Sequence, residues 1–113
     1  MKIISKKIPL AELKKIAKKS FGNLVKAVVD VEKKLMVIDG ELHADEEALL
    51  LGKGSKQENL WGINLYPEIN SVDWIEFDSM INLRPASGNR SRGVDNPQLR
   101  DKIITIVNQL VKK

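Results

Sequence analysis

The chain has 113 residues, of which 42% are hydrophobic and 30% charged, and its formal net charge is +4. These values are typical of one globular domain, which we expect to span residues 1–113. The chain has no cysteine, which excludes disulfides and thiolate sites, and it has neither a signal peptide nor an apolar run of ~18 residues, so we expect a cytoplasmic protein without a membrane partner.

The first third of the chain predicts one helix and two strands. An amphipathic helix is expected over residues 9–19, with a proline at its start, lysines on its outer side and Gly22 as its terminator. The valine- and isoleucine-rich segments 24–31 and 35–39 predict two strands joined by a tight charged turn.

Residues 41–52 are compatible with two structures. As a helix, the segment has Asp45 as a possible cap and acidic residues in its first turn. As a strand, residues 47–51 enter a turn formed by the sequence GKGS, and the chain returns as a strand over residues 57–66. We favour the hairpin because the turn residues are so typical of one.

The last third predicts a strand and a helix. Residues 73–83 alternate between apolar and polar side chains, which indicates a strand with one buried face. Asn96 is placed to cap a final helix that begins at Pro97. The predicted fold is therefore α+β, with an antiparallel sheet and the N- and C-terminal helices packed on one of its faces.

The sequence RPASGNRSRG at residues 84–93 predicts an anion-binding loop. All four arginines of the chain lie within residues 84–100, and the loop runs directly into a predicted helix N-terminus. Guanidinium groups, glycines with free backbone N–H groups and a helix dipole all favour a bound anion. The predicted binding residues are Arg84, Gly88, Asn89, Arg90, Ser91 and Arg92.

The expected ligand is a phosphorylated molecule: a nucleic-acid backbone, a nucleotide or another phosphate ester. Residues 1–35 carry ten lysines and three acidic residues, and residues 36–80 carry two lysines and ten acidic residues. Basic segments at both ends favour a surface for polyanions. Alternatively, the loop arginines pair with the chain's own acidic middle segment.

His43, the one histidine, supports a second hypothesis. Together with Asp45 and Glu47 it predicts a small phosphoester hydrolase or nuclease, in which His43 is the acid or base and the carboxylates orient it or hold a divalent ion. The simpler alternative is a surface histidine satisfied by a neighbouring acid. A third hypothesis is a structural or interaction protein that forms a homodimer through a sheet edge. No cofactor is predicted.

Three segments carry a resemblance to a known family: GELHADEEALLL, KQENLWGINLYPE and INLRPASGNRSRGVDNPQLRDKI. Together they resemble a family of small bacterial and archaeal proteins of unknown function, and the RPxxGNRS core is their most specific part. The resemblance implies a compact single domain and a whole prokaryotic protein, with no assigned catalytic residues.

Overall fold

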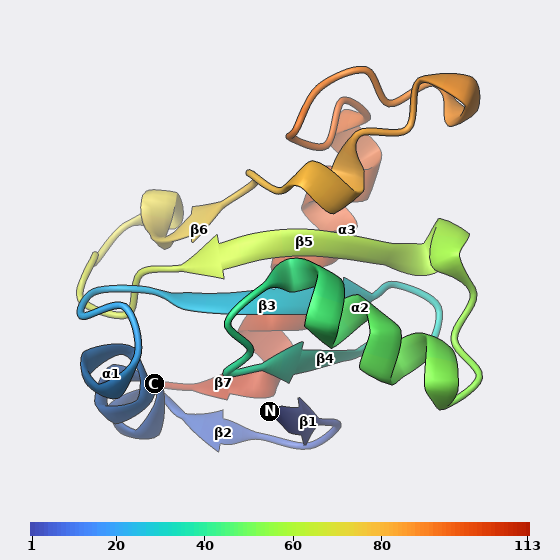
Figure 1. Cartoon of the computed structure of the whole chain (residues 1–113). Helices are drawn as coiled ribbons and strands as arrows, with labels where there is room; N and C mark the ends of the chain where they lie inside the picture. Colours follow the sequence, from blue (N-terminus) through green and yellow to red (C-terminus); the bar gives the residue numbers. More distant parts are fainter.

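The computed structural model describes residues 1–113 and shows an α+β fold, which confirms the predicted class (Figure 1). Its five-stranded antiparallel sheet has the order β1-β4-β3-β5-β6. These strands are β1 (Lys2–Ile4), β4 (Leu35–Ile38), β3 (Val25–Asp30), β5 (Leu60–Leu65) and β6 (Ile75–Glu76). A second, parallel pair joins β2 (Ile8–Pro9) to β7 (Val111–Lys112).

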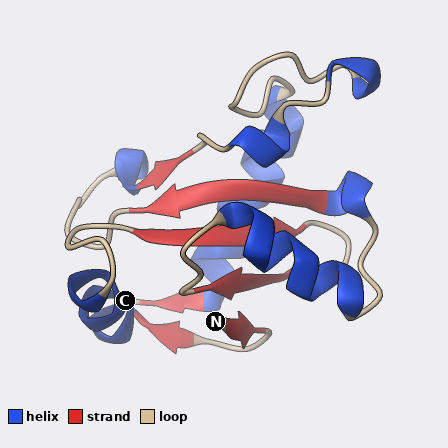
Figure 2. Cartoon of the chain, in the orientation of Figure 1, coloured by secondary structure: helices blue, strands red, loops and turns tan.

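Three α-helices and four short 3-10 turns complete the fold (Figure 2). The helices are α1 (Leu10–Lys19), α2 (His43–Gly52) and α3 (Pro97–Leu110). The 3-10 turns are η1 (Gln57–Asn59), η2 (Val72–Trp74), η3 (Met80–Asn82) and η4 (Pro85–Ser87). None of the helices has both the length and the apolar composition that crossing a membrane requires.

Helices cover both faces of the sheet, so the prediction of terminal helices on one face was incomplete. Buried residues of α1 and α3 share a 21-residue cluster with alternate side chains of β3, such as Ala27 and Val29. Val28, which points the other way, belongs to a smaller cluster with Leu50 of α2. In Figure 1, α2 lies in front of the sheet and α3 behind it.

The favoured hairpin over residues 41–66 was wrong, because residues 43–52 form α2. Glutamate, alanine and leucine are strong helix formers and dominate this segment. The GKGS sequence ends the helix: Gly54 has a φ of 95°, its N–H donates to the carbonyl of Leu51, and the N–H of Ser55 donates to Leu50. This pattern is a Schellman motif, which uses the same glycine that would make a hairpin turn.

The strand predicted over residues 73–83 was also wrong for most of its length. Only Ile75 and Glu76 pair with β5, and 3-10 turns lie on both sides of them. Further along β5, the side chain of Asn82 bonds both backbone groups of Gly62, at 2.8 Å to its N–H and 2.9 Å to its carbonyl. At this edge of β5, the buried side-chain amide of Asn82 therefore makes the two hydrogen bonds that a neighbouring strand would otherwise make with Gly62.

Other local predictions are confirmed. Strands β3 and β4 form the predicted hairpin, and the carboxylate of Asp30 accepts the N–H groups of Glu32 and Lys33 in its turn. The Asn96 side chain caps α3, and Pro97 begins that helix. The first helix is present as predicted, but it begins at Leu10, so Pro9 is its N-cap residue and not its first helical residue.

Candidate functional site

A polar cleft of about 210 Å³ opens on the α2 face of the sheet, and we call it the His43 cleft. Strands β3 and β5 contribute Lys26 and Asn64, which are paired directly across the two strands. The N-terminus of α2 contributes Leu42 and His43. The chain beyond β6 closes the cleft with Asp78, Ser79, Met80, Ile81 and Arg92.

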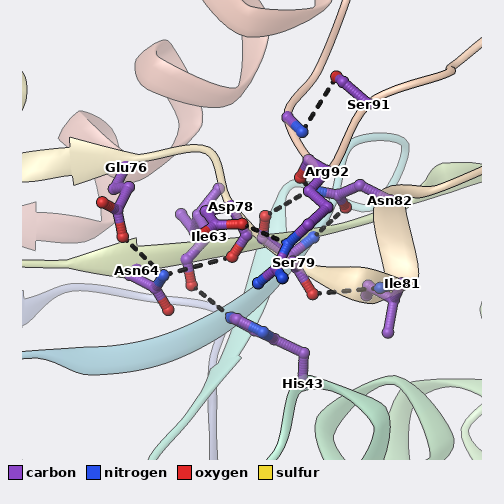
Figure 3. Close-up of polar contacts among 12 residues, drawn as sticks. His43, Ile63, Asn64, Glu76, Asp78, Ser79, Ile81, Asn82, Ser91 and Arg92 are labelled. Atoms are coloured by element: carbon purple, nitrogen blue, oxygen red, sulfur yellow. Dashed lines mark hydrogen bonds and ion pairs between the residues drawn. The ribbon is translucent and has the colours of Figure 1, made fainter.

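His43 is held against β5 in one tautomer. Its Nε2 lies 2.8 Å from the carbonyl oxygen of Ile63, and because a carbonyl only accepts, Nε2 carries the proton (Figure 3). The Cδ2 edge of the ring lies beside Gly62, where a Cβ would approach to 3.2 Å. Burial lowers the pKa of His43 below its ordinary value. At neutral pH the ring is therefore uncharged, and Nδ1, on the other side of the ring, keeps its lone pair.

Asn64 presents a buried acceptor beside His43, and the interaction of its side chain with the ring acts to raise the pKa of that histidine, against the larger effect of burial. The residue is 8% exposed, and its amide nitrogen donates to Glu76 Oε1 at 2.9 Å and to the carbonyl of Asp78 at 3.3 Å. These bonds fix the orientation of the amide, and Oδ1 has no hydrogen bond. Figure 3 shows this oxygen on the side of the amide nearer His43. A buried acceptor is costly when unpaired, so Oδ1 favours a donor group from a ligand in the cleft.

The lining of the cleft carries an excess of one positive charge, and the Glu76 carboxylate lies behind it, bonded to Asn64. Lys26 and Arg92 contribute two cations and Asp78 one anion, which lies 2.7 Å from Arg92 Nε. The side chain of Arg92 is 56% exposed, and its terminal guanidinium nitrogens make no hydrogen bond in the protein. The N-terminus of α2 adds its dipole, and its N-cap residue, Leu42, has no side chain that can cap it.

Arg84 does not reach the cleft. Its guanidinium carbon lies 4.6 Å from the centre of the Trp61 ring, and Nη2 donates to the carbonyl of Leu60 at 2.6 Å. Nη2 also lies 3.6 Å from Glu47 Oε2, and both side chains are 13% exposed. The sequence suggested Arg84 for anion binding and Glu47 for catalysis, whereas in the structure the two form a half-buried pair with each other.

The rest of the predicted loop is largely organised by its own hydrogen bonds. The Asn89 amide donates to the carbonyls of Asn82 and Gly93, and Gly88, with a φ of 88°, ends η4. The N–H of Arg90 and the hydroxyl of Ser91 both donate to Asp95. The Ser91 hydroxyl is the main reason that the pKa of Asp95 is lowered. The hydrogen-bond donors at this end of the loop thus converge on the Asp95 carboxylate of the chain itself.

His43, Asp45 and Glu47 do not come together either. Asp45 lines a different hollow, beside Asp39 and Glu41, while Glu47 pairs with Arg84. No group of three histidine or acidic side chains is arranged to hold a metal ion. Of the residues predicted for the two sites, His43 and Arg92 are the pair that the structure brings into one cleft.

Sequence reasoning missed Lys26, Asn64 and Asp78 as site residues. One signal for the first two was available: each is a polar residue in the interior of a strand, and the other interior residues of VKAVVD and LWGINL are not polar. Such residues are uncommon in a sheet covered on both faces and usually have a specific partner. Asp78 gave no such signal, because it lay in a segment that alternated like an exposed strand.

The fold and the cleft define a small α+β protein with a polar hollow beside a helix N-terminus. The chain belongs to the DUF5674 family, described as proteins of unknown function, and the match covers residues 2–110. Comparison with curated proteins and with solved structures found no match.

Proposed function

We propose that this chain binds a small anionic molecule, such as a phosphate ester, in the His43 cleft. One observation supports the proposal: Lys26, His43 and Arg92 come from three distant segments of the chain to line one cleft together with the buried amide of Asn64. Lys26, Arg92 and the α2 N-terminus favour the negative charge of the ligand. A hydroxyl or amino group of the same ligand donates to Asn64 Oδ1. This proposal moves the predicted anion site from the loop to the cleft.

Thermal unfolding with two simple anions tests the proposal. Near neutral pH, inorganic phosphate has a hydroxyl that can donate to Asn64, whereas sulfate has none. A ligand that prefers the folded state raises the melting temperature by mass action. We therefore expect phosphate to raise the melting temperature of the wild type, and sulfate to raise it less.

Two arginines of the loop provide a matched pair of variants. Arg92 lines the cleft, whereas the Arg90 side chain is exposed and makes no contact with an acidic group. Arg92→Ala should abolish most of the phosphate effect, and Arg90→Ala should preserve it. If the two variants lose the phosphate-induced rise in melting temperature to the same extent, the anion binds at the loop and not in the cleft. If phosphate does not raise the melting temperature of the wild type, anion binding is refuted.

The position of His43 favours a second function, hydrolysis of a phosphoester. An uncharged imidazole in the same cleft as Arg92 can accept a proton from an attacking water while the cation stabilises the phosphoryl charge. Activity on p-nitrophenyl phosphate or bis-p-nitrophenyl phosphate would then rise as the pH rises through the lowered pKa of His43. His43→Gln should remove this activity but retain phosphate binding. Turnover that is unchanged in this variant would exclude His43 as the base.

A further inference from the structure

A second hollow of about 580 Å³ lies directly beside the His43 cleft, and the two share Lys26 and Leu42 as lining residues. The end of α1 and the chain after it form one side of this second hollow, with Phe21 at its wall. The connection between β4 and α2 forms the other side, with Asp39 and Glu41. The two hollows are therefore neighbours on one surface, and we refer to them together as the groove.

Phe21 gives the second hollow an aromatic surface. This apolar side chain is 44% exposed, and the Lys26 ammonium lies 4.8 Å from the centre of its ring. Lys26 therefore stands between an exposed aromatic ring and the anion site of the His43 cleft. The ammonium lies over one face of this ring, so a nucleobase would stack on the remaining exposed surface of the ring, next to a cation that can bind its phosphate.

Asp39 and Glu41 supply hydrogen-bond acceptors on the opposite side of the second hollow. Asp39 has a φ of 66°, in the left-handed region that non-glycine residues seldom adopt. Both side chains are exposed and line the second hollow. Carboxylates of this kind accept hydrogen bonds from sugar hydroxyls and from the amino groups of bases. They also repel further phosphates, which favours a ligand with one phosphate over a polynucleotide.

We propose that the groove binds a free nucleoside monophosphate. Its phosphate occupies the His43 cleft beside Lys26 and Arg92, its base stacks on Phe21, and its hydroxyl or amino groups donate to Asp39 and Glu41. The combined size of the two hollows is in the range of pockets that hold small molecules. This inference rests on the anion site proposed above. It adds that the ligand carries a nucleobase and that Phe21 recognises this base.

Titration calorimetry with adenosine 5′-monophosphate, ribose 5-phosphate and inorganic phosphate tests the inference on the whole chain. Stacking of one base favours the nucleotide over the sugar phosphate by about tenfold or more in affinity. We expect this ratio in the wild type. In Phe21→Leu the ratio should fall to near one while the affinity for inorganic phosphate stays unchanged, and Phe21→Tyr should restore the ratio. Circular dichroism checks that each variant is folded.

The same titrations separate the two proposals. If adenosine 5′-monophosphate and ribose 5-phosphate bind equally well and Arg92→Ala weakens the binding of both, the anion site stands and nucleotide recognition is overturned. If none of the three ligands binds, both proposals fail. A short oligoribonucleotide that binds more tightly than the monophosphate would overturn the assignment to a free nucleotide.

Discussion

Glu46 is a fully buried acid that holds the connection between β4 and α2. Its Oε2 accepts the N–H of Gly40 at 2.9 Å, and its Oε1 has no partner. A Cβ on Gly40 would lie 2.5 Å from the Glu46 side chain, so only glycine fits there without a shift. Burial raises the pKa of Glu46 to about 9. The carboxyl is therefore protonated at neutral pH, and it supports residues 39–41 at the edge of the proposed groove.

This raised pKa predicts how stability changes with pH. In the unfolded chain Glu46 titrates near its ordinary pKa of 4.5, whereas in the folded chain it titrates near 9. Its contribution to the free energy of unfolding is fully present below about pH 4.5. It is lost as the pH rises towards about 9, by at most about 1.4 kcal/mol per pH unit.

Glu46→Gln tests this dependence, because glutamine keeps the shape and the acceptor for Gly40 but does not titrate. In urea unfolding between about pH 5 and about pH 9, the wild type should lose more stability than the variant. Parallel curves for the two proteins would show that Glu46 is ionised in the folded state.

At the site, the sequence identified individual functional residues but did not show which of them lie close together in space. His43 and Arg92 were both predicted as functional, but for two separate sites, because their proximity depends on how the chain beyond β6 folds back over β5. Lys26 and Asn64 meet only through the register of β3 and β5. Arg84 follows the alternative in which a loop arginine pairs with the acidic middle segment, because its guanidinium group contacts Trp61 and Glu47. An arginine looks the same in sequence whether its guanidinium group faces a ligand or the protein.

Among the elements, helix α3 has the clearest local determinant. Asn96 Oδ1 accepts the N–H groups of Gln98 and Leu99, at 2.9 and 3.3 Å. Asn96→Ala removes both bonds and should lower the free energy of unfolding by about 1 kcal/mol. Asn96→Asp keeps the acceptor, so it should remain close to the wild type in the same denaturation experiment. An alanine variant as stable as the aspartate variant would show that the cap contributes nothing.

Elements with such local signals were predictable, and elements that depend on tertiary contacts were not. The first helix, the β3–β4 hairpin and α3 follow from periodicity, turn residues and caps. The GKGS sequence serves a helix end as well as a hairpin, so residues 41–52 were misassigned. The short strands β1, β2 and β7 carry too few residues for any pattern to indicate them.

For the whole molecule, the pair β2–β7 joins the two ends of the chain (Figure 1). Ile8 and Val111 are register partners, 2% and 5% exposed, and both belong to the main hydrophobic cluster. Val111→Ala removes about two methylene-sized groups from this cluster and should cost about 2 kcal/mol in unfolding free energy. The exposed neighbour Lys112 provides the control, since Lys112→Ala should change stability by less than about 0.5 kcal/mol. Equal effects of the two variants would place Val111 outside the core.

The same pair has a consequence for the order of folding. Ile8 and Val111 are about a hundred residues apart in the chain. Their contact therefore closes a loop that contains nearly all of the remaining helices and strands. Such a closure has a large entropic cost until the intervening chain is ordered. We expect the sheet and α3 to form first and the two ends to join last. Mutations at Ile8 and Val111 would then accelerate unfolding and leave the refolding rate nearly unchanged.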